Sequence, residues 1–196
     1  MLKLQDITFA IDGKPLLVDA SAVIPAGHKV GIVGRNGTGK TTLFRLIRNE
    51  WSIDSGTIDY PAHYRVGGVE QEAPANNVSL LDTVLAADIE YDALQAEAKT
   101  ATDPLRIAEI HTRLSDINAH SAESRAATIL AGLGFDRHAQ ARPCAEFSGG
   151  WRMRVALGAV LFARPDLLLL DEPTNYLDLE GAVWLEGFLL SLIHIS

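Results

Sequence analysis

The stretch Gly34-Arg35-Asn36-Gly37-Thr38-Gly39-Lys40-Thr41 decides the fold of this chain. It matches the phosphate-binding pattern G-x-x-x-x-G-K-[ST] without a mismatch. The apolar run 29–33 before it predicts a short buried strand, and the run 41–47 after it predicts the beginning of a helix. Glycines let successive backbone N–H groups point at one anion, which the helix N-terminus also attracts. We therefore expect the ammonium of Lys40 to reach phosphate oxygens and the hydroxyl of Thr41 to hold Mg²⁺.

Composition places the chain among ordinary globular proteins. Its 196 residues fit about one domain, and the net charge of −8 argues against a surface that binds nucleic acid throughout, although local basic residues could still contact phosphates. The single cysteine, Cys144, excludes an internal disulfide and is expected to fill a small space in the core, in keeping with a reducing cytoplasm. Neither a signal peptide nor a stretch that could insert into a membrane is apparent.

Strand patterns come first along the chain and helix patterns follow. Predicted strands cover 2–9, 16–24, part of 52–60 and 64–70, with a turn at 12–15 between the first two. Predicted helices cover 81–99, the stripe 107–117 and 126–133, the last closed by Gly132 or Gly134. The first two helices form either an antiparallel pair that projects from the core or an ordinary helical layer, and the sequence does not decide between them.

Two further motifs carry candidate chemistry. Leu167-Leu168-Leu169-Leu170-Asp171-Glu172 predicts a buried strand that ends in two carboxylates. Adjacent carboxylates are costly there unless they face a cation, so we expect Asp171 near a metal ion and Glu172 where it could polarise water for attack on a phosphate. Ser148-Gly149-Gly150, ahead of a predicted helix, is a second helix start suited to anions. Each motif alone could be a simple turn. Because the same chain also contains the phosphate loop, a functional role for both motifs is favoured.

The three motifs in this order resemble the ATP-binding cassette family over nearly the whole chain. Gln71 matches the Q-loop position, and Asp171-Glu172-Pro173-Thr174-Asn175-Tyr176-Leu177-Asp178 matches Walker B running into the D-loop. Two sequence motifs look like those of ABC-F proteins, in detail like those of a bacterial YheS-type branch. They are the D-loop sequence and Phe147-Ser148-Gly149-Gly150-Trp151-Arg152-Met153-Arg154. The resemblance implies an α/β fold, a P-loop NTPase ABC cassette. Such a cassette has an antiparallel β subdomain, a mostly parallel core sheet and a helical subdomain that carries an arm-like helical hairpin.

The same resemblance implies a domain plan. Residues 1–189 would form a single ABC ATP-binding domain with a core of 1–78 and 135–189 and a helical arm insertion at 79–134. Two cassettes in one polypeptide are the ABC-F plan, and this chain looks like an incomplete first cassette. We expect 190–196 to be a non-native tail, because the family-like sequence fades there, and His194 is not assigned the family's switch role because it comes too early.

The resemblance also implies the site residues, with ATP and Mg²⁺ as cofactors. Phosphate and nucleotide contacts fall on Gly34, Asn36, Gly37, Gly39, Lys40, Thr41 and Thr42, and on Ser148, Gly149, Gly150 and Asp178 toward the other cassette. The resemblance assigns Thr41, Gln71 and Asp171 as ligands of the metal ion. It assigns Glu172 and Gln71 as catalytic residues. The aromatic residue that stacks on adenine has no clear counterpart, because Ile11 occupies its place and Phe9 is more plausibly core.

The leading functional prediction is an ATP-binding and ATP-hydrolysing ABC-F cassette that acts on the ribosome, near rRNA and tRNA. It would pair with a second cassette, either the missing C-terminal half or another copy, so we expect little or no hydrolysis from this chain alone. The alternative is the ATP-binding subunit of an ABC membrane transporter. The D-loop sequence and the arm argue against this alternative. A third possibility is an interaction module without catalysis, which the intact Lys40, Asp171 and Glu172 argue against for the parent protein.

Overall fold

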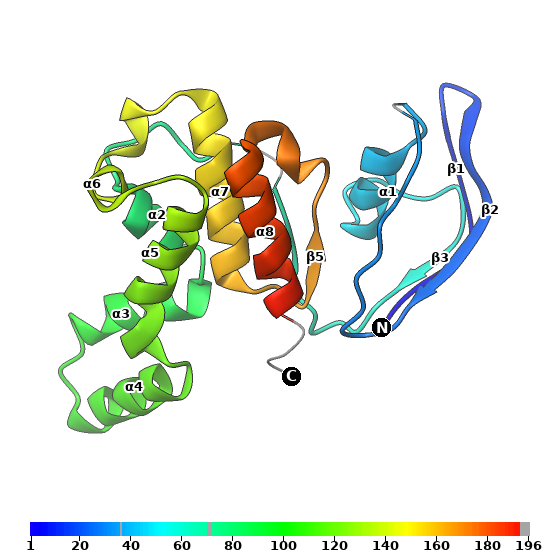
Figure 1. Ribbon diagram of the computed structural model, residues 1–196. Coiled ribbons are helices and arrows are strands. Elements are labelled where there is room, and N and C mark those ends of the chain that lie inside the picture. The colour runs from blue at the N-terminus through cyan, green and yellow to red at the C-terminus, as the bar shows by residue number, and fades with distance from the viewer. Residues whose placement is uncertain (36, 70–71, 193–196) are drawn as a thin grey trace. The chain divides into compact units, whose positions relative to one another are not determined.

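Strands dominate the first part of the chain and helices the rest (Figure 1). The computed structural model describes residues 1–35, 37–69 and 72–192. The strands are β1 Leu2–Ile11, β2 Lys14–Ile24, β3 Ser55–Asp59, β4 Val66–Gly68 and β5 Leu167–Leu169. The α-helices are α1 Lys40–Ile47, α2 Leu80–Leu85, α3 Ile89–Ala98, α4 Pro104–Asp116, α5 Ala122–Gly132, α6 Arg137–Gln140, α7 Gly149–Ala163 and α8 Leu179–Ser191. Three 3₁₀ turns are η1 Ala119–Ser121, η2 Cys144–Glu146 and η3 Pro173–Tyr176.

Contacts divide the chain into two units. The first unit holds Met1–Val66 together with Asp166–Asp171, and the second holds Gly67–Pro165 together with Glu172–Ser196. The first therefore contains β1, β2, β3, α1 and β5, and the second contains α2 to α8. The sequence-based division into a core and an arm insertion remains a prediction.

An antiparallel sheet of order β2-β1-β3 forms the first unit. β1 and β2 join through Asp12 and Gly13, whose φ angles of 49° and 74° are those of a tight type I′ hairpin turn. The turn is shorter than predicted, because Lys14 and Pro15 already pair with Ile11 and Ala10.

A β-bulge in β1 changes which of its residues face the core. Leu2 and Leu4 are buried, and after the bulge Ile7 and Phe9 are buried instead. The pairing shifts between Leu4 and Ile7, where Asp6 has a φ of 48° and its N–H donates to Ser21 Oγ at 2.8 Å. The extra residue keeps the apolar face on one side, because side chains in a strand alternate with a period of two.

Helix α1 supplies the other half of this small core. Ile47 is buried in one cluster with Leu2, Leu4 and Ile7, and Leu169 of β5 belongs to the same cluster. Burying each of these side chains contributes roughly 1.5–3 kcal/mol to folding. The helix behind the phosphate loop is therefore held by apolar packing within its own unit. β5 also pairs with β4 in a short parallel sheet.

The predicted strand 29–33 is not formed. These residues have no regular secondary structure, and Val30, Ile32 and Val33 are exposed, Val33 to 97%. A strand needs a neighbour to accept and donate its backbone hydrogen bonds. Neither of the two sheets in the described part of the chain includes this run, so its apolar pattern alone does not fold it.

Helix α7 is the centre of the second unit and contacts α2 and α5 (Figure 1). Val155 and Leu161 of α7 are buried, as are Val84 of α2 and Leu130 of α5. Cys144 is fully buried, as predicted for a core filler, and its Sγ lies 3.2 Å from Thr83 Oγ1. This helical core, rather than a sheet, supports the motif that begins α7.

The predicted helix 81–99 is two helices, α2 and α3. The break falls at 86–88, where Asp88 becomes the N-cap of α3 and accepts a hydrogen bond from Tyr91 N at 3.1 Å. An aspartate at a helix start satisfies N–H groups that would otherwise lack a partner. The apolar residues keep a helix-like spacing across the break, so the sequence pattern did not indicate that a new helix begins after Asp88.

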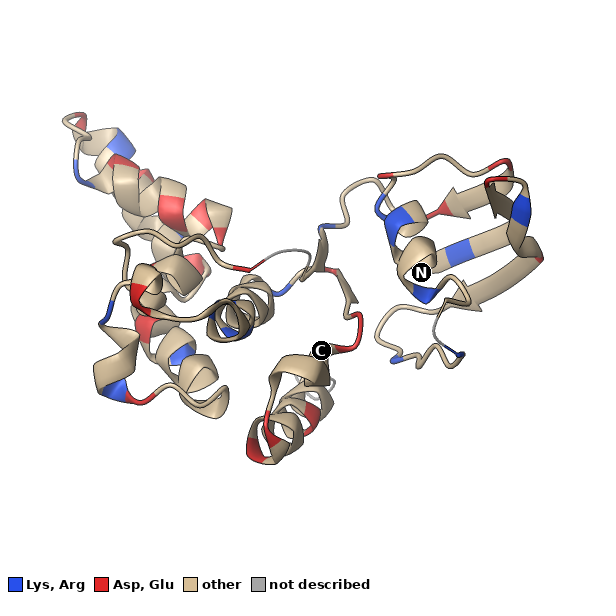
Figure 2. Ribbon diagram, turned by 90° about the horizontal axis from the view of Figure 1, so that it is seen from above, with Lys and Arg blue, Asp and Glu red and all other residues tan. Residues whose placement is uncertain are grey.

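Helices α3 and α4 pair in antiparallel fashion, so one of the two predicted arrangements, the pair, is confirmed. Arg106 binds Glu97 near the connecting loop, and Arg113 binds Glu90 seven residues further along each helix. Basic and acidic residues both lie on this pair, as Figure 2 shows in blue and red. These ion pairs are exposed, and salt screens such pairs, so they fix the pairing more than they stabilise it.

Close packing of α5 on α8 yields the first prediction. A Cβ added to Gly132 would lie 1.9 Å from the ring of Trp184, so Gly132→Ala must displace that ring. We expect the variant to lose about 1–3 kcal/mol of unfolding free energy in urea titration, the usual cost of overpacking.

Gly187→Ala in α8 is the matched control. A Cβ there meets nothing within 4 Å, and replacing glycine by alanine inside a helix stabilises by up to about 1 kcal/mol. Equal unfolding curves for the two variants would contradict the close packing of α5 on α8.

Candidate functional site

The loop before α1 has the backbone that a phosphate site requires. Gly37 and Gly39 have φ angles of 81° and 94°, a region that glycine enters without strain. Gly39 is also the N-cap of α1, and as a glycine it offers no side-chain acceptor. The first N–H groups of the helix are therefore left for an acceptor from outside, and an anion suits this end of the helix dipole.

The ammonium of Lys40 is bound by backbone carbonyls of the phosphate loop. Its Nζ donates to the carbonyl oxygens of Gly34 at 2.8 Å and Arg35 at 3.2 Å. Thr38 closes the same turn, because its Oγ1 donates to the Arg35 oxygen at 2.9 Å. The ammonium thus satisfies loop carbonyls, and phosphate oxygens could take their place as acceptors.

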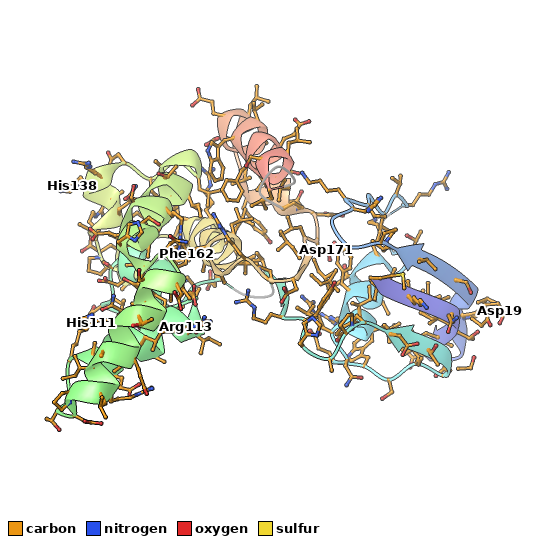
Figure 3. All side chains as sticks on the ribbon, turned by 90° about the horizontal axis from the view of Figure 1, so that it is seen from below. Asp19, His111, Arg113, His138, Phe162 and Asp171 are labelled. Atoms are coloured by element: carbon orange, nitrogen blue, oxygen red, sulfur yellow. The ribbon has the colours of Figure 1, made fainter. Side chains whose placement is uncertain are left out.

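A hydrogen bond from Thr41 to Asp171 joins two motifs that are 130 residues apart. Thr41 Oγ1 donates to Asp171 Oδ2. Asp171 follows β5 (Figure 3), and both residues lie in the first unit. A hydroxyl and a carboxylate oxygen are ligands that Mg²⁺ accepts, usually from one or two protein groups with phosphates and water completing the shell. The pair fits such an ion, although the described residues contain no cluster of three or more His, Cys, Asp or Glu that could hold a metal.

Glu172 begins the second unit directly after Asp171. Its φ of 45° is unusual for a side chain other than glycine, and Pro173 then starts η3. Asn175 Nδ2 donates to Glu172 Oε2 at 2.8 Å, which holds the exposed carboxylate. A non-glycine residue in this conformation costs about 1–3 kcal/mol and is often found at functional sites.

Ser148 is the N-cap of α7, as the sequence predicted for the start of this helix. Its side chain makes no capping hydrogen bond. Instead, Glu72 lies against the helix start, where a Cβ on Gly149 would come within 2.5 Å of Glu72 Oε2. Arg152 Nη2 donates to Glu72 Oε1 at 2.8 Å. Gly149 therefore leaves room for a carboxylate beside this helix N-terminus.

Arg154 is a residue that the sequence reasoning missed. Its Nε donates to the Tyr176 oxygen at 2.6 Å, and its Nη1 donates to Asp178 Oδ2 at 3.0 Å. Its guanidinium also lies over the ring of Trp151, 4.3 Å from the centroid. This half-buried guanidinium thus links α7 to the D-loop. The spacing of Trp151 and Arg154, three apart on a helix, was a signal that they share a face.

Asp178 is engaged within the chain. Its Oδ1 accepts from Gly181 N at 2.9 Å and caps α8, while its Oδ2 binds Arg154. The Gly181 N–H first, and Arg154 second, hold the pKa of this carboxyl below its usual range. Its predicted contact with a second cassette remains a prediction.

Other predicted residues have different outcomes. Thr42 is half-buried in α1, and Gly150 is exposed in the first turn of α7. Phe9 is 8% exposed and stacks on Trp51 with centroids 5.9 Å apart, so the expectation that it belongs to the core is confirmed. Asn36 and Gln71 lie outside the described residues, as does His194.

The ABC transporter family matches residues 17–175, and the chain belongs to this family. More particularly, its relatives support an ABC-F cassette. The Escherichia coli K12 relative named "Probable ATP-binding protein YheS" is 48% identical over 90% of this chain and 28% of its own length. Human "ATP-binding cassette sub-family F member 3" is 40% identical over 96% of this chain and 27% of its own. The chain thus spans little more than a quarter of these relatives.

Solved structures confirm the predicted fold class. An ABC transporter ATP-binding protein from Pyrococcus furiosus has a TM-score of 0.69 at 20% identity over 98% of this chain and 86% of its own. A dimeric bacterial ABC transporter cassette has a TM-score of 0.67 at 20% identity over 99% and 83%. The fold is an α/β ABC cassette with an antiparallel sheet, a parallel sheet and helices.

The capping role of Asp178 predicts a pH dependence. Because its pKa is lowered in the folded state, its stabilising effect is present above the ordinary pKa of an aspartate and is lost as the pH falls through the folded value. We expect the difference in unfolding free energy between the parent and Asp178→Ala to be largest near neutral pH and to shrink in acid. Urea titrations at several pH values measure it.

Leu179→Ala is the control, since this side chain is 80% exposed and does not titrate. Its difference from the parent should be independent of pH. A pH-independent difference for Asp178→Ala would contradict the capping role.

Proposed function

We propose that this chain is the first ATP-binding and ATP-hydrolysing cassette of an ABC-F translation factor that acts on the ribosome. The observation that carries the ATP-binding part is the hydrogen bond between Thr41 and Asp171. It brings the phosphate loop and the end of the Walker B strand together in one unit, with Lys40 beside them. A glycine turn with a chance Lys-Thr pair would not explain why a carboxylate 130 residues away meets that threonine.

In this proposal the loop binds a triphosphate. Lys40 exchanges the Gly34 and Arg35 carbonyls for phosphate oxygens, and the N–H groups after Gly37 and Gly39 donate to the same anion. Gly34, Asn36 and Thr42 complete the set of nucleotide contacts. Thr41 and Asp171, with Gln71, hold Mg²⁺. When bound, that ion neutralises charge on the phosphates.

Glu172 is the proposed catalytic carboxylate. It is exposed and held by Asn175, so it could accept a proton from a water molecule that attacks the terminal phosphate. Gln71 would position that water. We expect the isolated chain to hydrolyse ATP slowly or not at all, because the full site needs a second cassette.

The second cassette is the proposed partner. Ser148, Gly149 and Gly150 would bind the phosphate held by that partner, at the N-terminus of α7. Two similar solved structures are described as dimeric, and one of these is described as bound to ADP and Pi. The partner would be the second half of a longer protein or another copy of this chain.

The proposal of action on the ribosome rests on the resemblance to ABC-F proteins and on the helical hairpin. Both named relatives are matched over most of this chain, and one is a sub-family F member. The antiparallel pair α3–α4 is the segment that we propose to be the ABC-F arm. We place the protein in the cytoplasm, with rRNA and tRNA as neighbours. No helix in the described part of the chain has the length and apolar character to cross a bilayer.

The nucleotide site is tested by Lys40→Ala. Loss of a charge-assisted hydrogen bond of about 1.5–3 kcal/mol should weaken Mg-ATP binding roughly 10- to 100-fold in titration calorimetry. Lys14→Ala, at the β1–β2 turn, is the control and should bind as the parent does. A flat titration for the parent chain would overturn the proposal.

Glu172→Gln tests the catalytic role. Without a base, ATP should be retained and cassette dimers should accumulate, and size-exclusion chromatography with and without Mg-ATP measures this. Unchanged nucleotide retention and an unchanged oligomeric state would contradict the role of Glu172. Co-purification of the full-length protein with ribosomes supports the translation role, whereas co-purification with a permease would favour a transporter subunit.

A further inference from the structure

A cavity lies among α5, α7 and α8 in the second unit. Its volume is about 190 Å³. Its lining includes Ser124, Arg125 and Ile129 of α5, Phe162 of α7, Arg164 directly after α7, and Phe188 of α8. Phe162, labelled in Figure 3, is buried. The lining residues all belong to the second unit, so the cavity is separate from the phosphate loop, which belongs to the first.

Arg125 is held in place on one wall of this cavity. Its Nη1 donates to Ser121 Oγ at 3.2 Å, and its guanidinium lies 5.5 Å from the ring centroid of Phe162. Its Nε is buried and has no hydrogen-bond partner among the described residues. A buried donor without an acceptor is rare in folded proteins, so the Arg125 guanidinium has hydrogen-bonding capacity that its contacts within the chain leave unused.

A second guanidinium adds to the positive charge. Arg164 follows α7 with a φ of 47° and lines the same cavity. Burial first, and the positive charge of Arg164 second, lower the pKa of Arg125, while Asp88 and Tyr91 act in the opposite direction. The described lining contains no aspartate or glutamate. Both guanidiniums line the same partly apolar cavity, where an oxyanion could contact either of them.

The remaining walls are mostly apolar. Ile129, Phe162 and Phe188 contribute them, and the hydroxyl of Ser124 adds a donor beside the two arginines. An inorganic ion would use the guanidiniums and leave the apolar walls in water. A ligand with a charged end and an apolar body would use both.

We propose that this cavity binds a small organic oxyanion, a carboxylate or phosphate ester carried on a ring-sized apolar body. The guanidiniums of Arg125 and Arg164 bind the oxyanion, since their planar forks match its geometry. The apolar body lies against Ile129 and Phe188. The site is independent of ATP, so this proposal can be tested separately from the nucleotide-binding proposal.

Four probes test the chemistry on the whole chain: phenyl phosphate, benzoate, inorganic phosphate and benzyl alcohol. Ligand-observed NMR and titration calorimetry give the affinities. We expect phenyl phosphate or benzoate to bind saturably and at least about tenfold more tightly than inorganic phosphate or benzyl alcohol. The better of the two organic anions identifies the head group as phosphate or carboxylate. Equal affinity for all four probes, or no saturable binding, would overturn the proposal.

Variants test the location. Arg125→Gln and Arg164→Gln should each weaken the organic anion at least about tenfold, the effect expected for loss of a charged contact. Arg137→Gln, on α6 outside the cavity, is the control and should leave binding unchanged.

Lys40→Ala should also retain binding of the organic anion, because the phosphate loop is a different site. If Arg125→Gln fails to fold, since that arginine also packs on Phe162, the more exposed Arg164 carries the test. Binding that is lost in Lys40→Ala but kept in Arg164→Gln would place the anion in the phosphate loop and refute the cavity as its site.

Discussion

The bond between the Thr41 hydroxyl and the Asp171 carboxylate is the contact on which the candidate site depends. Thr41 is placed by α1, which Ile47 anchors on the antiparallel sheet, and Asp171 is placed by β5, whose Leu169 enters the same core. Apolar packing therefore sets the relative position of two polar groups from distant parts of the sequence. A loss of packing in this core would move the two oxygens apart even if both residues were unchanged.

Two half-buried guanidiniums position segments of the second unit, as the small apolar core positions segments of the first unit. Arg152 holds Glu72 against the start of α7, and Arg154 ties the same helix to the carbonyl of Tyr176 and to Asp178. Arginine suits this work because its donors form a rigid fork. The D-loop and the segment after Gln71 are thereby fastened to one helix, so a displacement of α7 would reach both.

Sequence patterns predicted the phosphate loop, the hairpin of β1 and β2, the helices that follow the phosphate loop and Ser148, and the strand before Asp171. Each of these features is encoded by a short stretch of sequence, such as glycines in a loop, two turn residues or a run of apolar residues. The exposed run 29–33 was predicted wrongly because pairing depends on neighbours that a local pattern does not contain. Arg154 was missed because its partners lie more than 20 residues away.

The pairing of α3 with α4 has a consequence for how stability is distributed. Helix α3 has no buried residue, and α4 has only Ile110, so little apolar packing supports the hairpin beside its exposed ion pairs. Such an element opens at low free energy without unfolding the helices around α7. Its amide hydrogens are then the first of the second unit to exchange with solvent deuterium, and rising ionic strength speeds that exchange. The hairpin is thus a separate cooperative segment, able to order against a surface while the rest of the protein keeps its structure.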